Sequence, residues 1–162
     1  PRHGTISIPL RPDIDDRPRQ MVDFVHGKRA ITSYEVISEQ SGQTLIALHP
    51  MTGRTHQLRV HCAHPEGLNT PIVGDRLYGK SSERLCLHAQ RITFRHPVTG
   101  KQMTFSTPMP RFTGQKGTTS EMNDKPSANA CPTWRLRTFF FAKTRPKDAS
   151  NNIINYKIRL KP

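Results

Sequence analysis

The chain has 162 residues, of which 33% are hydrophobic, and a formal net charge of +13. This length suits one domain with a tail, and the low apolar share allows only a modest core. The sequence holds no apolar run near the ~20 residues of a membrane-spanning helix and no signal-peptide pattern at its start.

Cysteine usage and charge indicate a compartment and a partner. The three cysteines, Cys62, Cys86 and Cys131, are an odd number without close pairs, which argues against a disulfide framework. We therefore expect a cytoplasmic, monomeric protein without a membrane contact. The excess positive charge favours RNA or DNA as the partner. Charge alone, however, predicts only non-specific attraction.

The predicted elements of the first 112 residues are mostly short strands. We expect strands at residues 5–8, 31–37, 44–48, 85–94 and 102–107, a charged loop at 11–20, and hairpin turns at 40–42 and 96–100. One helix should run from Thr55, its cap, to about His64, before Pro65 stops it. Leu58 and Cys62 should share its core face. This pattern predicts an α+β fold with a mostly antiparallel mixed sheet and few short helices.

The composition changes near residue 112. All eight histidines lie before this point, and residues 1–112 hold fifteen Lys and Arg against nine Asp and Glu, a net of +6. Residues 113–162 hold ten Lys and Arg against three acids, a net of +7. We therefore predict a folded part at 1–112 and a basic, disordered or loosely packed tail at 113–162. Aromatics among the tail's cations could stack on bases, but a disordered basic tail is the simpler interpretation.

Polar residues concentrate at the start of the predicted helix. Arg59 lies one step round from Leu58, where its guanidinium could hold a carboxylate by two parallel hydrogen bonds. Spacing alone favours the alternative, a surface arginine on an amphipathic helix. Asp75 follows Gly74, which favours a turn over a catalytic acid, with Arg76 as its charge partner.

The histidines invite a metal site, but their spacing opposes it. His56 and His61 are five residues apart, so they point in different directions on a helix, and no Cys-x-x-Cys or His-x-x-x-His pair is present. Capping and packing roles are more typical of such histidines. His88 lies in an apolar strand and is expected to be a core residue. We therefore predict no metal.

Three blocks in fixed order carry a resemblance that no single residue does. They are residues 52–61, Thr-Gly-Arg-Thr-His-Gln-Leu-Arg-Val-His; residues 71–78, Pro-Ile-Val-Gly-Asp-Arg-Leu-Tyr; and residues 85–89, Leu-Cys-Leu-His-Ala, followed by His96-Pro97. Together they resemble the C-terminal part of the catalytic domain in RluA-type pseudouridine synthases, which modify ribosomal and transfer RNA. Residues 4–10 and 33–36 also look like strands of that family. The resemblance covers residues 1–112.

The resemblance implies an isomerase that detaches uracil from its ribose, turns it and rejoins it through carbon 5, without cofactor or metal. Its nucleophile is an Asp in a His-Arg-Leu-Asp block, which these 162 residues do not contain. The family's partner of that Asp maps onto Arg59. Substrate contacts are expected from Arg54, Thr55, His56 and Gln57, and Leu87 looks like the apolar wall near the base.

Two functions follow from these expectations. The first is an RNA pseudouridine synthase acting on ribosomal or transfer RNA, of which this chain is a piece that is inactive alone; the start without Met agrees with a fragment. The alternative is a basic RNA-binding module that keeps the partial fold and performs no reaction. Tyr34 does not replace the family's stacking tyrosine, because it belongs to a later strand.

Overall fold

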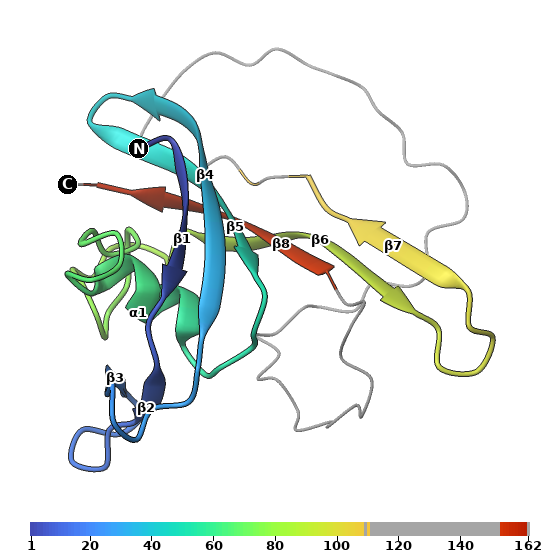
Figure 1. The fold of residues 1–162 in the computed structure, drawn as a ribbon. Helices are drawn as coiled ribbons and strands as arrows, with labels where there is room; N and C mark the ends of the chain where they lie inside the picture. The colour runs from blue at the N-terminus through green and yellow to red at the C-terminus, as the bar shows by residue number, and fades with distance from the viewer. Residues whose placement is uncertain (109, 111–152, 162) are drawn as a thin grey trace. The chain divides into compact units, whose positions relative to one another are not determined.

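A computed structural model describes residues 1–108, 110 and 153–161 of the chain (Figure 1). Within these residues the strands are β1 (His3–Ser7), β2 (Leu10–Pro12), β3 (Gln20–Val22), β4 (Ile31–Gln40), β5 (Gln43–Pro50), β6 (Leu87–Arg95), β7 (Gln102–Ser106) and β8 (Ile153–Leu160). The helix is α1 (Gln57–Ala63). None of the described helical residues forms a segment long and apolar enough to cross a membrane.

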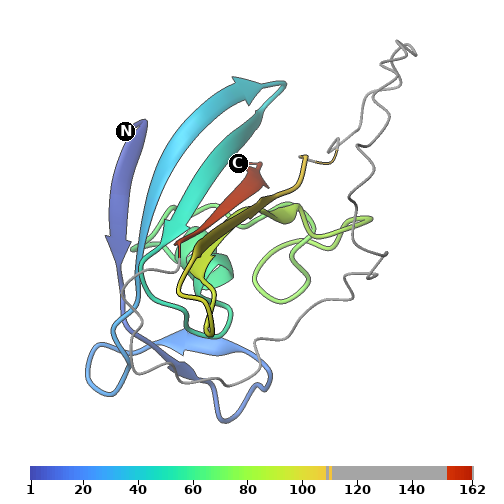
Figure 2. The ribbon, with the colours of Figure 1, turned by 90° about the vertical axis from the view of Figure 1, so that its right-hand side faces the viewer.

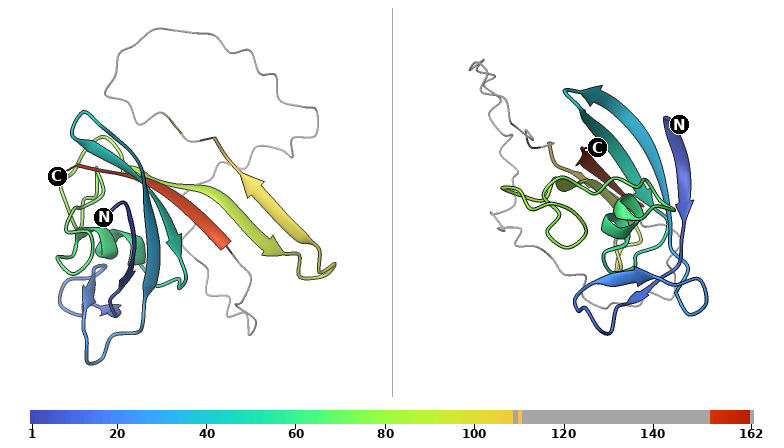
Figure 3. Two further views of the ribbon diagram at one scale, coloured as in Figure 1. Left: turned by 45° about the horizontal axis from the view of Figure 1, so that its top comes forward. Right: turned by 90° about the vertical axis from the view of Figure 1, so that its left-hand side faces the viewer.

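The described strands form one large sheet and one small one. The large sheet has the order β1-β4-β5-β8-β6-β7, and α1 packs against one of its faces (Figure 2). β2 and β3 pair separately and lie beside α1 (Figure 3). Every pairing between described strands is antiparallel, so the α+β class is confirmed while the expected mixed sheet is not seen.

The end of the chain differs from the predicted tail. Residues 153–160 form β8, which pairs with β5 on one side and β6 on the other. Ile158 is completely buried and Leu160 nearly so. These two apolar residues alternate with basic ones, so the segment can bury one face of a strand. The prediction relied on the net charge of residues 113–162 and did not use this alternation. The rest of the predicted tail, including its aromatic residues, lies outside the described residues.

The core lies between α1 and the large sheet. Its first cluster joins Leu58 and Cys62 of α1 to strand residues such as Leu48 and Ile158. The prediction that Leu58 and Cys62 share the core face is therefore confirmed. Because side chains alternate along a strand, the opposite face of these strands is free to be polar.

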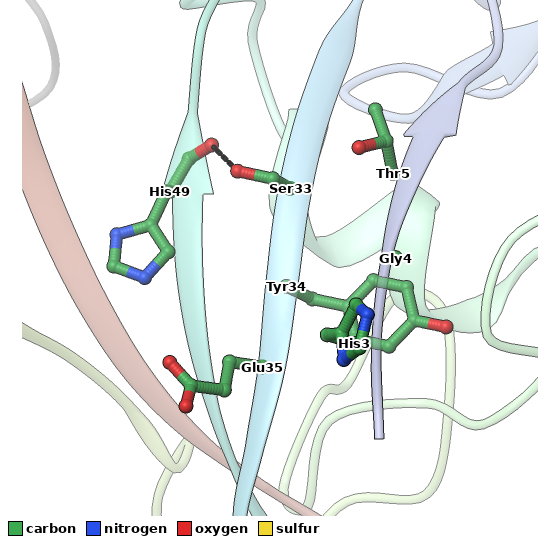
Figure 4. Close-up of a pocket in the computed structure, with 7 residues that line it drawn as sticks. All are labelled: His3, Gly4, Thr5, Ser33, Tyr34, Glu35 and His49. Atoms are coloured by element: carbon green, nitrogen blue, oxygen red, sulfur yellow. Dashed lines mark hydrogen bonds between the residues drawn. The ribbon is translucent and has the colours of Figure 1, made fainter. Parts of the chain in front are cut away.

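That polar face carries a shallow pocket of about 390 Å³ across β1, β4 and β5 (Figure 4). Thr5, Ser33 and His49 stand in one cross-strand row, and His3 and Glu35 stand in the next. The Ser33 hydroxyl donates a long 3.4 Å hydrogen bond to the His49 carbonyl. The pocket is open and exposed, and it lies on the face of the sheet away from α1.

The two predicted hairpins are present, but the helix begins later than expected. β4 turns into β5 through Ser41 and Gly42, both at positive φ. α1 begins at Gln57, and its N-cap is His56 at a φ of 52°, without a side-chain cap. Thr55 is therefore not the cap, because the chain enters the helix through a left-handed residue instead.

His61 is a histidine that the fold buries within α1. It is 0% exposed, and neither ring nitrogen has a hydrogen-bond partner within the described residues. Burial lowers the pKa of His61 to about 4, and the neighbouring Ile8 backbone offsets only part of this effect. The imidazole is therefore neutral at pH 7.

This burial predicts an acid-sensitive fold. An unfolded histidine has a pKa of about 6.5, so protons favour the unfolded chain as pH falls from there toward the folded value of about 4. The full loss is about 3 kcal/mol. His61→Leu should flatten this part of the stability profile in urea unfolding between pH 7 and 4.5. An unaltered slope in His61→Leu would contradict the assignment.

Candidate functional site

Three segments distant in sequence meet beside the start of α1. They are α1 itself, the loop at residues 71–79, and the β2–β3 hairpin. A second, smaller core cluster holds them together: Val60, Leu10 and Ala30 are buried, and Tyr78 packs against them. This cluster fixes the backbone on which the polar residues of the site stand.

Arg59 and Asp75 form the central ion pair of this site. Arg59 Nε donates to Asp75 Oδ2 at 2.8 Å, and Arg59 Nη2 donates to Asp75 Oδ1 at 2.6 Å. The side chain of Asp75 is 0% exposed and that of Arg59 only 16%. This two-bond contact is the geometry that a guanidinium offers to a carboxylate. Arg59 is therefore not the surface arginine that spacing alone favoured.

Asp75 also closes the turn in which it lies. Its Oδ1 accepts hydrogen bonds from the backbone N–H of Leu77 at 2.9 Å and of Tyr78 at 3.1 Å. The predicted turn is confirmed, but the predicted charge partner is wrong: Arg76 is exposed, and Arg59 pairs with Asp75 instead. Burial raises the pKa of Asp75, but the bonds from Arg59 and the two backbone groups outweigh it and hold the pKa below its usual value.

Tyr78 connects the ion pair to the hairpin. The Arg59 guanidinium lies 5.1 Å from the centre of the Tyr78 ring. The phenol oxygen accepts from the Gln20 backbone N–H at 2.7 Å and lies 2.9 Å from His56 Nδ1. Burial, then the Arg59 charge, lower the pKa of His56. A neutral His56 can accept the phenol proton at Nδ1, which leaves Nε2 as a donor.

Gln57, an expected substrate contact, is a structural residue. It is 3% exposed, and its amide nitrogen donates to Ile31 O and to the Thr32 hydroxyl. Its amide oxygen accepts from the Thr52 hydroxyl and from the Arg54 backbone N–H. All its hydrogen-bonding capacity is used within the chain. The polar atoms of Gln57 therefore connect the loop before α1 to β4, and the expected substrate role of Gln57 stays a prediction.

The other expected contacts divide between the surface and the core. Arg54 and Thr55 are exposed beside His56, and Arg54 Nε donates to the Arg29 carbonyl at 3.2 Å. Leu87 is half-buried and packs against the core cluster that contains Leu58. Arg54, Thr55 and His56 are consecutive residues of the loop that leads into α1. The structure places Leu87 at the start of β6.

Sequence reasoning predicted the turn at Asp75 but missed the pairing of Asp75 with Arg59 and the contacts of Tyr78 and Gln20. Tyr78 follows Asp75 by three residues, which is the spacing of a side-chain-closed turn, and this was the available signal. Nothing local shows that the turn reaches Arg59, sixteen residues earlier. Across the described residues no three His, Cys, Asp or Glu side chains are grouped as metal ligands.

Gly74 sets the position of Asp75 and provides a test of the loop. Its φ is 79°, and a Cβ there would lie 1.9 Å from the Arg84 carbonyl oxygen. Gly74→Ala should therefore move the backbone and cost more than about 2 kcal/mol of stability. Gly42→Ala is the matched control, because Gly42 has a φ of 66° and open space around it, so about 1 kcal/mol is expected. Equal losses in thermal unfolding would show that the Arg84 contact is unimportant.

The sequence of this part of the chain matches a known family model. Residues 1–64 match the model described as RNA pseudouridylate synthase. The Dual-specificity RNA pseudouridine synthase RluA of Haemophilus influenzae is 44% identical over 110 residues, which are 64% of this chain and 49% of that protein. The same-named protein of Escherichia coli K12 is 42% identical over 114 residues, 67% of this chain and 51% of that protein.

The chain resembles the RluA-type RNA pseudouridine synthases. The resemblance expected from the three sequence blocks is therefore confirmed. The chain spans about half the length of the curated relatives it matches. The family match at residues 1–64 includes Arg59 but not its partner Asp75, which lies further along the chain.

Proposed function

We propose that this chain is part of an RNA pseudouridine synthase and supplies the arginine that pairs with the nucleophilic aspartate. The observation that carries the proposal is that Arg59, in a segment similar to RluA-type enzymes, is fixed by a buried ion pair with two hydrogen bonds to Asp75. An arginine that only bound solvent would not be held by two hydrogen bonds to a buried carboxylate. The two named relatives are RNA pseudouridine synthases, which supports RNA as the substrate class.

The geometry suits the proposed chemistry. A nucleophilic aspartate must stay ionised while partly buried, and a fixed guanidinium lowers its pKa and orients it. The reaction breaks the bond between uracil N1 and the ribose and forms a bond from ribose C1′ to uracil C5. C5 loses its hydrogen as a proton and N1 gains a proton, so the product is an isomer and no oxidant or reductant is required. In this proposal the nucleophile comes from a His-Arg-Leu-Asp block outside these 162 residues.

The exposed residues beside the site serve RNA binding in this proposal. Arg54 and Thr55 lie at the surface next to His56, whose Nε2 is a donor in the tautomer that accepts the Tyr78 hydroxyl at Nδ1. Leu87 is the proposed apolar wall. Turning a uridine out of RNA costs a few kcal/mol, which phosphate contacts and stacking must offset. The net charge of +13 supports such contacts. The proposed protein is a cytoplasmic monomer that modifies ribosomal or transfer RNA.

A fusion experiment tests the function. The 162-residue chain alone should form no pseudouridine in transfer or ribosomal RNA, because it lacks the nucleophile. Joining it to the N-terminal half of the Haemophilus influenzae relative should restore pseudouridine, detected by chemical mapping. The same fusion with the nucleophilic aspartate changed to asparagine is the control. Pseudouridine formed by the chain alone, or none formed by a folded fusion, would contradict the proposal.

A non-catalytic RNA-binding module is the alternative, and the charge balance favours it as the second candidate. Such a module would bind RNA with a steep salt dependence. A fusion that folds and binds RNA without forming pseudouridine would support this alternative.

A further inference from the structure

We propose that Asp75 is a positioning residue: it holds two nitrogens of Arg59 so that the third, Nη1, is presented to an oxyanion. This inference rests on the proposed function, in which that oxyanion is the carboxylate of the nucleophile. A phosphate of the RNA offers the same chemistry to a guanidinium, and the experiment below separates the two.

The hydrogen-bond pattern of Arg59 leaves one nitrogen available. Nε and Nη2 are bound to Asp75, at 2.8 and 2.6 Å. Nη1 has no hydrogen bond within the described part of the chain. Since Asp75 is fully buried while the Arg59 side chain keeps 16% of its surface exposed, the pair is anchored inward and reaches the surface only through Arg59. A guanidinium can bind carboxylates at more than one of its edges.

The surroundings of the pair restrict its movement. The Tyr78 ring lies beside the guanidinium, and the phenol is itself held by Gln20 and near His56. Asp75 is fixed in turn by two backbone N–H groups. A long arginine side chain loses much rotamer freedom on binding a ligand. Because the contacts with Asp75 and Tyr78 already restrict Arg59, less entropy is lost when it binds an anion.

A second aspartate in the chain shows what an ordinary pair of this kind looks like. Asp23 Oδ1 accepts from the backbone N–H groups two and three residues later, as Asp75 does, and Asp23 pairs with Arg11. That pair is more exposed, at 32% for Arg11 and 13% for Asp23, and Arg11 Nη1 is turned back to the Pro12 carbonyl. It therefore serves as a control pair in which the carboxylate holds the guanidinium by one hydrogen bond, from Nε, rather than by two.

Nuclear magnetic resonance of the 162-residue chain tests the proposal without any enzymatic activity. The Arg59 side-chain N–H signals, identified by their loss in Arg59→Lys, are followed during titration with sodium acetate and, separately, with inorganic phosphate at constant ionic strength. We expect a saturable shift in the parent chain. In Asp75→Asn the apparent affinity should fall at least about fivefold, while Asp23→Asn should leave it unchanged. A stronger response to acetate points to the nucleophile's carboxylate, and a stronger response to phosphate points to RNA.

Two outcomes would overturn the proposal. One is the absence of any saturable shift at Arg59 in the parent chain with either anion. The other is an unchanged affinity in a folded Asp75→Asn variant, which would make the pair purely structural. If Asp75→Asn does not fold, Tyr78→Leu is the second variant, because it removes the ring beside the guanidinium and should also lower the anion affinity of Arg59. An unchanged affinity in Tyr78→Leu would contradict the proposal that these contacts position Arg59. Failure of the fusion to form pseudouridine, with the anion response intact, would reject the enzymatic function alone.

Discussion

Asp75→Asn is expected to destabilise the chain by about 3–5 kcal/mol, the usual cost of removing one partner from a buried ion pair. Asparagine has nearly the same shape and can keep the Oδ1 contacts to Leu77 and Tyr78, so the loss comes from the unpaired Arg59 charge. Urea unfolding of both proteins at pH 7 measures the difference in free energy.

The pH dependence and a control sharpen this prediction. The folded pKa of Asp75 is lowered, so its stabilising effect is present above the unfolded pKa of about 3.9 and is lost as pH falls through the folded value. The gap between the parent chain and Asp75→Asn should therefore shrink below about pH 4. Asp23→Asn breaks the more exposed pair with Arg11 and should cost less. Equal losses at Asp23 and Asp75 would show that burial of the pair is unimportant.

Arg59→Ala is expected to slow the chemical step by about 10²-fold or more in the active fusion, as expected for loss of a positioning contact. The nucleophilic aspartate would lose its cation, so its pKa should rise and its orientation loosen. RNA affinity should fall by less than about tenfold, because one cation among many is removed. Single-turnover rates and RNA binding, measured separately, distinguish these effects.

Two further variants complete this experiment. Arg59→Lys should rescue the rate only partly, because an ammonium cannot make the two-pronged contact with Asp75 and still reach a second carboxylate. Arg11→Ala removes a cation of the other ion pair and should leave the rate of the chemical step unchanged. Weaker RNA binding with an intact rate in Arg59→Ala would make Arg59 a phosphate contact, contrary to the proposal.

Local patterns in the sequence were sufficient to predict most of the sheet. Period-two alternation predicted β1, the runs at 31–37 and 44–48 predicted β4 and β5, and the turn at 40–42 marked the hairpin between them. The same reasoning gave the core face of α1, because Leu58 and Cys62 are four residues apart. These features depend on neighbours within a few residues, which is why the sequence alone determines them.

The tertiary structure alone decided the rest of the fold and the site. The basic segment at 153–160 becomes the strand between β5 and β6 because two distant strands offer it backbone partners and a buried face. Arg59 changes from a surface arginine to half of a buried pair because a loop sixteen residues later brings Asp75 against it. The side-chain nitrogen of Gln57 binds Ile31 and Thr32 of β4, which lie 26 and 25 residues earlier in the chain. Each of these outcomes depends on contacts between residues far apart in sequence, which composition and spacing do not record.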